Sequence, residues 1–368
     1  MKIAVVAPDL TMLGGNAVQA QALMDGLGSE GYEVALVPIN PTFPPALRRL
    51  RRRRGLRTVV NQALYLPGLL RLRRADVAHI VSARGLSFVL ASLPAILAAR
   101  SFGKRAVLHY HHGAAEDHLA RWGPLVHPWL RLVDEIVVPS EFLRAIFARH
   151  GYRTRVIRNI VDTSRFRYRE RRILRPRLLS TRNLELYYRV DYTLEAFARV
   201  KARYPDATLT VAGFGSEEDR LRRLAVSLGV EGIRFIGRVE PEAMPRCYDD
   251  ADIFLNSSVL DNQPVSVIEA FAAGLPVVST GVGDLAALVR DRETGLRVPT
   301  RDPGAMADAV VMLLEHPDFA AALARRARQE AERYTWARVR HEWAAVYSGR
   351  GGAPQAAGTE PGTRAPAV

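Results

Sequence analysis

The sequence predicts an α/β protein with two domains, each a parallel sheet with helices on both faces. Short apolar runs that suit buried strands alternate with longer amphipathic runs that suit helices, and this alternation is typical of doubly wound sheets. It occurs twice, on either side of an arginine-rich stretch at residues 163–176 that lacks apolar periodicity. The chain has 368 residues, 48% of them hydrophobic, which is enough for two full cores.

The first domain is expected to span residues 1–162. Its opening strand, Lys2–Ala7, is a short apolar run that ends at Pro8 and Asp9. The elements expected after it are, in chain order, a helix at 17–30, strands at 33–39 and 77–81, a helix at 86–100, strands at 106–109 and 135–139, a helix at 141–150 and a strand at 155–158.

The second domain is expected to span residues 177–334, after a linker at 163–176. Its expected elements are a strand at 177–180, a helix at 191–203, a strand at 208–212, a helix at 217–228, strands at 233–236, 253–256 and 277–279, and helices at 306–314 and 320–334. An amphipathic helix at 335–348, with Trp336 and Trp343, is expected to pack back on the first domain. Residues 349–368 are rich in Gly, Pro and Ala, which predicts a disordered tail.

The net charge of +14 has a local source, because arginines crowd the region Arg48–Arg74. The apolar run Val59–Leu70 lies between its two basic clusters. Basic residues beside apolar ones suit an anionic membrane surface, where each contributes roughly 1 kcal/mol. The alternative is an arginine-rich solvated face. Nucleic acid is not an expected partner, since the sequence contains no recognised nucleic-acid-binding module.

Cysteine content and hydropathy point to a cytoplasmic protein. Cys247 is the single cysteine, so an intramolecular disulfide and a cysteine-based metal cluster are excluded. The first residues read as a buried strand and lack the long apolar segment of a signal peptide. The apolar stretch Leu86–Ala99 is short for a bilayer span and contains Pro94, which favours a buried helix.

One stretch carries the strongest functional signal. Residues 261–279 read DNQPVSVIEAFAAGLPVVS, with Asp261 and Glu269 eight residues apart. Pro264 stands where a helix can begin, because a proline in the first turn loses no hydrogen bond. The backbone N–H groups of Val265 and Ser266, with the helix dipole, would then favour an anion. The pattern suits a ligand with both a diphosphate and sugar hydroxyls.

Other polar motifs follow predicted strands, and ligands of open α/β sheets bind beyond the carboxyl ends of the strands. Gly14 and Gly15 follow the first strand, and glycines let a backbone approach a phosphate closely. Gly213 follows the strand at 208–212. The run His109-Tyr110-His111-His112 follows another strand and suits either a polar pocket or a metal site.

At this point the sequence resembles the family-4 retaining glycosyltransferases of the GT-B fold, in which two Rossmann-like domains face each other across a cleft. The resemblance rests on Asp261, Glu269 and the Gly274–Val278 continuation, since the family pattern is usually two glutamates separated by seven residues. It extends over most of the chain through further motifs, which are Leu13-Gly14-Gly15, residues 156–162 with Phe166, residues 211–215, Gly283 and residues 294–296.

The resemblance implies a role for each candidate residue. Glu269 would bind the ribose hydroxyls of a nucleotide, and Asp261 would contact the donor sugar. Arg182 would bind the diphosphate, since a guanidinium matches phosphate oxygens. His111, and next His112, would face the donor sugar. The glycine loops, with the helix start at 265–266, would complete the donor site, which takes no metal and no separate cofactor.

Two departures from the family pattern stand out. Asp261 is one methylene shorter than the usual glutamate. The lysine usual about five residues after Arg182 is absent, and Arg189 is the candidate substitute. They motivate the alternative of a catalytically silent protein with this fold that binds a nucleotide or a partner. Asp250 and Asp252 could be mistaken for a metal-binding pair, but their place directly before a strand favours a structural role.

The resemblance therefore implies a hexosyltransferase-like enzyme that uses a nucleotide-sugar donor. The donor would bind mainly to the second domain and the acceptor mainly to the first. The acceptor class stays open among a glycan, a lipid-linked acceptor and a small molecule. The basic region Arg48–Arg74 allows a peripheral position on the inner face of the membrane. An epimerase of the same fold is the less favoured enzyme.

Overall fold

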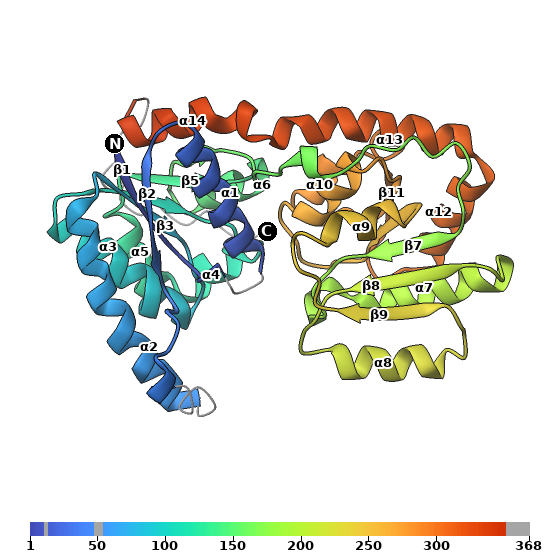
Figure 1. Cartoon of the computed structure of the whole chain (residues 1–368), viewed down its shortest axis with the longest axis horizontal. Helices are drawn as coiled ribbons and strands as arrows, with labels where there is room; N and C mark the ends of the chain where they lie inside the picture. The colour runs from blue at the N-terminus through green and yellow to red at the C-terminus, as the bar shows by residue number, and fades with distance from the viewer. Residues whose placement is uncertain (11–13, 48–53, 351–368) are drawn as a thin grey trace, which may run out of the picture.

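In the computed structural model, which describes residues 1–10, 14–47 and 54–350, the chain forms two α/β domains side by side (Figure 1). Leu13 of the glycine loop, Arg48–Arg53 of the basic region and residues 351–368 of the expected tail lie outside the described residues. Both sheets are entirely parallel, so the predicted α/β class with two Rossmann-like domains is confirmed.

The first sheet has six strands in the order β2-β1-β3-β4-β5-β6. Its strands are β1 (Lys2–Ala7), β2 (Glu33–Pro38), β3 (Val77–Val81), β4 (Arg105–His109), β5 (Glu135–Val138) and β6 (Arg155–Val156). Its helices are α1 (Gly15–Ser29), α2 (Arg54–Gly68), α3 (Leu93–Ser101), α4 (Ala115–Arg121), α5 (Gly123–Leu130) and α6 (Glu141–Arg149), with a 3-10 helix η2 (Leu69–Arg74) after α2.

The second sheet also has six strands, in the order β12-β11-β10-β7-β8-β9. Its strands are β7 (Arg177–Ser180), β8 (Thr208–Ala212), β9 (Ile233–Gly237), β10 (Ile253–Asn256), β11 (Val277–Thr280) and β12 (Leu296–Val298). Its helices are α7 (Val190–Arg203), α8 (Glu218–Ser227), α9 (Met244–Asp249), α10 (Val265–Ala272), α11 (Leu285–Leu288), α12 (Pro303–Glu315) and α13 (Pro317–Ala331).

Each sheet buries both of its faces, which explains why the strands read as continuous apolar runs. In β1, Ile3 and Val5 join one hydrophobic core while Ala4 and Val6 join the other, because successive side chains point to opposite faces. In the second domain, α7 and α12 pack on one face of the sheet, and α10 and α13 supply the core on the other.

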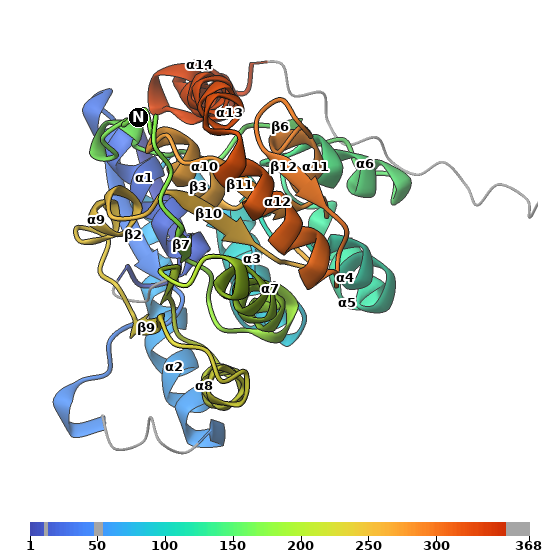
Figure 2. The same ribbon diagram turned by 90° about the vertical axis from the view of Figure 1, so that its right-hand side faces the viewer.

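The last helix crosses back to the first domain. Figures 1 and 2 show α13 and α14 (Trp336–Ser348) along one side of the molecule, with α13 over the second domain and α14 over the first. Trp343 and Tyr347 of α14 are buried in the core of the first domain. Gly26 of α1 leaves room for Trp336, whose ring lies 2.3 Å from where a Cβ would stand.

One run that was expected to form a single helix forms two helical pieces. The run expected as a single helix at 86–100 is a π-helical turn, Phe88–Ser92, followed by α3. Pro94 is in the first turn of α3, where its missing N–H costs nothing, so the proline starts the second piece. Among the described residues, no helix is both long and apolar enough to cross a membrane.

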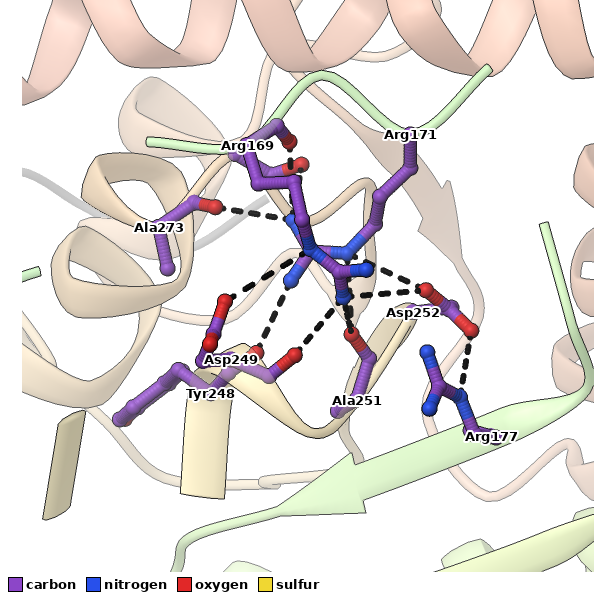
Figure 3. A network of polar contacts seen from close by, with 9 residues as sticks. Arg169, Arg171, Arg177, Tyr248, Asp249, Ala251, Asp252 and Ala273 are labelled. Carbon is purple, nitrogen blue, oxygen red and sulfur yellow. Dashed lines mark hydrogen bonds and ion pairs between the residues drawn. The ribbon is translucent and has the colours of Figure 1, made fainter. Parts of the chain in front are cut away.

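The linker is fixed to the second domain by Arg169 and by the buried side chain of Arg171 (Figure 3). Arg171 donates hydrogen bonds to the carbonyl groups of Tyr248, Ala251, Ala273, Gly274 and Arg169 at 2.9–3.1 Å. Its guanidinium also lies 3.3 Å from Asp252, which pairs with Arg177 at 2.7 Å. Asp252 therefore anchors the linker and β7, as expected of a structural residue, and Arg171 ties together the carboxyl ends of α9 and α10.

Candidate active site

A cavity of about 560 Å³ lies between the two domains, beyond the carboxyl ends of both sheets. It brings together ten of the eleven predicted site residues. Four come from the first domain, namely Gly14, Gly15, His111 and His112. Six come from the second domain, namely Arg182, Gly213, Asp261, Val265, Ser266 and Glu269. Arg189 does not line the cavity.

Glu269 projects from α10 into the cavity beside a buried phenol. The hydroxyl of Tyr248 donates to Oε2 of Glu269 at 2.7 Å and accepts from Thr181 at 2.8 Å. Burial raises the pKa of Glu269, and the hydrogen bond from Tyr248 acts in the opposite direction. Tyr248 therefore fixes the orientation of this carboxylate at the cavity wall.

The amino end of α10 points into the same cavity. Pro264 is the residue directly before the helix rather than its first residue, with an extended ψ of 119°. Val265 and Ser266 open the helix, and among the described residues their backbone N–H groups have no acceptor. An anion beside them would satisfy both donors and gain from the helix dipole.

Arg182 and Asp261 form an ion pair in this structure. Their Nη2 and Oδ2 atoms are 2.6 Å apart, and each side chain is only 9% exposed. Arg182 also donates to Ser266 Oγ at 3.0 Å, and the ring of Tyr188 packs against its guanidinium at 4.0 Å. The residue expected to bind the diphosphate is thus neutralised by the residue expected to contact the sugar.

The residues between the two acids join the domains. Asn262 accepts from Ser140 at 2.6 Å, and Gln263 donates to the carbonyl of Pro139 at 2.9 Å. Asn159 donates its side-chain amide to the carbonyl of Gln263 at 2.8 Å. The loop that carries Asp261 is therefore held against the first domain by hydrogen bonds that cross the cleft.

Two glycines let this loop approach closely. A Cβ on Gly113, which follows the histidine run, would lie 3.0 Å from the backbone of Asp261. A Cβ on Gly283 would lie 2.1 Å from the carbonyl oxygen of Asp261, and Gly283 has a φ of 57°. Gly283 therefore excludes a side chain, whereas a side chain at Gly113 would require the acidic loop to shift by a few tenths of an ångström.

The glycines of the two loops differ in how closely they are packed. At Gly14 and Gly15, a Cβ would meet no described atom within 4 Å, so packing against the described residues does not require glycine at either position. At Gly213, a Cβ would lie 2.2 Å from the carbonyl oxygen of Arg182. Gly213 thus allows the close packing that positions the loop after β7.

The histidine run divides between the cavity and the core. His111 and His112 line the cavity, and burial lowers the pKa of each to about 4. His109 is buried and lies 3.3 Å from His79, while His118 pairs with the hydroxyl of Tyr110 at 3.0 Å. His111 and His112 are therefore neutral at neutral pH and contribute uncharged imidazoles to the cavity wall.

Arg189 lies at the start of α7 with a left-handed backbone, φ 48°. It forms a bidentate ion pair with Asp191 at 2.8–2.9 Å and packs on the ring of Tyr192. Arg189 is thus paired outside the cavity, so the structure does not bring the candidate substitute for the absent lysine to the cavity wall.

Sequence reasoning missed one residue behind the cavity and two in its wall. Tyr248 is buried behind Glu269 in α9, whose sequence carries no motif, and only the structure brings the two together. Arg165 of the linker and Arg238 after β9 line the cavity and add positive charge. Arg238 could have been found from its position in the sequence, because it follows a predicted strand of the second domain. Within the described part of the chain, no group of three or more His, Cys, Asp or Glu residues could hold a metal ion.

Comparison with known proteins gives one family-model match for each domain. The model described as Glycosyltransferase Family 4 matches residues 13–165. The model described as Glycosyl transferases group 1 matches residues 175–316. The boundary between the two matches falls in the linker.

The sequence is also similar to named glycosyltransferases and glycogen synthases. The chain is 35% identical over 162 residues to D-inositol 3-phosphate glycosyltransferase of Corynebacterium urealyticum, covering 42% of this chain and 38% of that protein. It is 30% identical over 249 residues to glycogen synthase of Mycobacterium tuberculosis, covering 64% and 59%. The matched region is thus less than two thirds of the length of either relative.

Solved structures share the whole fold. Anabaena HepE in complex with UDP and glucose has a TM-score of 0.74 at 18% identity, over 95% of this chain and 100% of that one. Sucrose-phosphate synthase from Thermosynechococcus elongatus has a TM-score of 0.73 at 17% identity, over 95% and 98%. The architecture is therefore GT-B, and with a family model on each domain the chain belongs to the family-4 glycosyltransferases.

Proposed function

We propose that this protein is a retaining glycosyltransferase that moves a sugar from a nucleotide-sugar donor to a glycan, a lipid-linked acceptor or a small molecule. The observation that carries the proposal is the arrangement around α10, where Glu269 and the free N–H groups of Val265 and Ser266 line one cavity with Arg182. A ribose diol and a diphosphate together match these groups.

In the proposed reaction, the bond between the anomeric carbon and the diphosphate oxygen breaks while the acceptor oxygen bonds to the same face of the sugar. The acceptor proton passes to the departing phosphate oxygen, so no protein base is required. Negative charge grows on the leaving diphosphate, and the α10 terminus with Arg182 stabilises it. These groups, with Arg165 and Arg238 nearby, would do so without a metal ion.

The first test is release of nucleoside diphosphate from a panel of UDP-, GDP- and ADP-sugars. Wild-type protein should release it from one donor class, and Glu269→Ala and Arg182→Ala should each remove most of this activity while the protein stays folded. Wild-type turnover in both variants would contradict the assignment of the site.

The alternative is a catalytically silent protein that binds a nucleotide or a partner. It is favoured by the pairing of Arg182 with Asp261 and by the distance of Arg189 from the cavity. Nucleotides that raise the melting temperature, with no sugar release from any donor, would support this alternative over the enzyme.

We also propose that the first domain binds the inner face of an anionic membrane from the cytoplasm. Ten arginines and no acidic residue stand between Glu33 and Asp76. Within this region α2 and η2 expose Leu56, Val59 and Leu70 to solvent beside basic side chains. Apolar and basic groups on one surface suit anionic lipid.

Flotation with liposomes tests the membrane proposal. The protein should float with vesicles that contain phosphatidylglycerol and stay at the bottom with vesicles of phosphatidylcholine alone. Binding should weaken as salt is added, because the attraction is largely electrostatic. Absence of binding to anionic vesicles at low salt would refute it.

A further inference from the structure

The exposed aromatic side chains of this protein gather at one place. Every Trp, Tyr and Phe of the chain lies within the described residues, and only Tyr187 and Phe214 are exposed, at 41% and 37%. Both line the cavity between the domains. Since all other aromatic rings are at least partly buried, two exposed rings at the cavity indicate a surface that a ligand covers.

Tyr187 belongs to the loop between β7 and α7, and Phe214 is bonded to the same loop. The backbone N–H of Leu184 donates to the carbonyl of Phe214 at 2.9 Å. Three residues later, the carbonyl of Tyr187 accepts from Val259 at 2.9 Å, which precedes Asp261 by two residues. Tyr187 is thus tied to the segment that leads into the acidic loop.

The position relative to the donor groups identifies the occupant. Glu269, the proposed ribose ligand, bonds to Tyr248 of α9, whereas Tyr187 is connected to the Asp261 end of the cavity. Arg182 lies between, since it bonds both Ser266 at the start of α10 and Asp261. Tyr187 therefore lies toward the Asp261 end, where the transferred sugar and the acceptor would bind, and Phe214 reaches the same loop through its hydrogen bond with Leu184.

The ring of Tyr187 packs against a neighbouring aromatic ring. Its ring packs edge-on against Tyr188, with ring centroids 4.4 Å apart, and Tyr188 in turn packs on the guanidinium of Arg182 at 4.0 Å. A tyrosine held in this way offers apolar area at little further cost in side-chain entropy. The loop thus presents a prepared surface rather than a loose side chain.

We propose that Tyr187 and Phe214 form a platform for a sugar ring of the acceptor, so that the acceptor of this enzyme is a saccharide. A pyranose has a face of C–H groups that packs on an aromatic ring while its hydroxyls stay at the edge for polar partners. The inference rests on the proposed transferase function and selects the glycan among the acceptor classes. A donor base would also stack on aromatic rings, and this competing occupant is decided by the test.

The experiment compares glycan binding with nucleotide binding in the same variants. Labelled full-length protein is applied to a printed glycan array, and calorimetry measures the affinity for UDP, GDP and ADP. The variants are Tyr187→Ala, Phe214→Ala and Tyr187→Phe. The matched control is Leu186→Ala, because Leu186 is an exposed neighbour, 62% accessible, that does not line the cavity.

Each alanine variant at the platform should lower the array signal about tenfold, the scale of one lost aromatic contact. Tyr187→Phe keeps the ring and should bind like wild type, as should the Leu186 control. Nucleotide affinity should stay within about twofold in all variants, since the platform lies outside the proposed ribose and diphosphate sites.

Three outcomes would overturn the proposal. They are glycan binding that survives in both alanine variants, a wild-type protein that binds no glycan on the array, and nucleotide affinity that falls with the aromatic rings. The last would assign the platform to the donor base. Failure of the transferase function itself would look different, because glycans would still bind while no nucleotide-sugar is turned over.

Discussion

Replacement of Asp261 by asparagine should make the protein bind nucleoside diphosphates more tightly. In the free protein, Asp261 neutralises Arg182 through a 2.6 Å contact between two side chains that are each 9% exposed. Asparagine has nearly the same shape but no charge, so the guanidinium of the variant lacks its ionic partner until a diphosphate arrives. In the variant, the diphosphate supplies the ionic interaction with Arg182 that Asp261 supplies in the free wild-type protein, and its binding gains that free energy.

The magnitude follows from the burial of the pair. Removing one partner of a buried ion pair costs about 3–5 kcal/mol, and the asparagine amide retains part of this as a neutral hydrogen bond. A gain of about 1.5–3 kcal/mol corresponds to an affinity roughly ten- to hundredfold higher. Transfer should nevertheless fall, because Asp261 is the proposed contact to the donor sugar.

Calorimetric titration measures the effect, with the nucleoside diphosphate that stabilises the wild-type protein. Asp250→Asn is the matched control. Asp250 is 69% exposed and lies 3.7 Å from Arg246, so this variant should bind the nucleoside diphosphate with the same affinity as wild type. A folded Asp261→Asn protein that binds the ligand no better than wild type, or less well, would show that Arg182 does not bind the diphosphate.

Two further predictions concern stability. Arg171→Met removes five hydrogen bonds and a contact to buried Asp252, and should cost about 3–5 kcal/mol, or of the order of 10 °C in melting temperature. Its neighbour Arg172 is 85% exposed, so Arg172→Met should melt within about 1 °C of wild type, and equal melting of both variants would contradict the anchoring role. Burial lowers the pKa of His79 to about 3 and of His111 to about 4, below the ordinary 6.5. The unfolded chain therefore binds more protons as pH falls below 6.5, and chemical denaturation should show stability lost from there toward pH 4, whereas a flat profile would refute neutral burial.

The strands were predictable because both faces of each sheet are buried. A strand covered on both sides must be apolar throughout, and β1, β3, β7, β8 and β10 begin and end where the apolar runs do, within one residue. Helix α2 was not predicted, since its apolar residues lie between arginine clusters and read as a surface region. Its Tyr65 is nevertheless buried in the core of the first domain.

The motif residues of the site were also predictable, because each follows a strand and strand ends of parallel sheets meet at one edge. Their partners were not. Arg182 and Asp261 are 79 residues apart, and Tyr248 and Glu269 are 21 apart with no periodic relation. Residue types and spacing predict which side chains could bind a ligand. They do not predict which partners these side chains contact in the free protein, because those contacts depend on side-chain packing.

Those contacts bear on how the cavity selects its ligand. Arg182 is paired with Asp261 and one oxygen of Glu269 is occupied by Tyr248, so a lone phosphate would have to compete with an existing partner of Arg182. The unpaired N–H groups at the start of α10 carry no such cost. A ligand that joins a diphosphate to a ribose and a sugar can engage the α10 terminus, Glu269 and Asp261 together, and release of Arg182 from its partner then coincides with arrival of the sugar. Under the proposed function, internal pairing would therefore lower the affinity for fragments more than for the complete donor, which favours discrimination over tight binding.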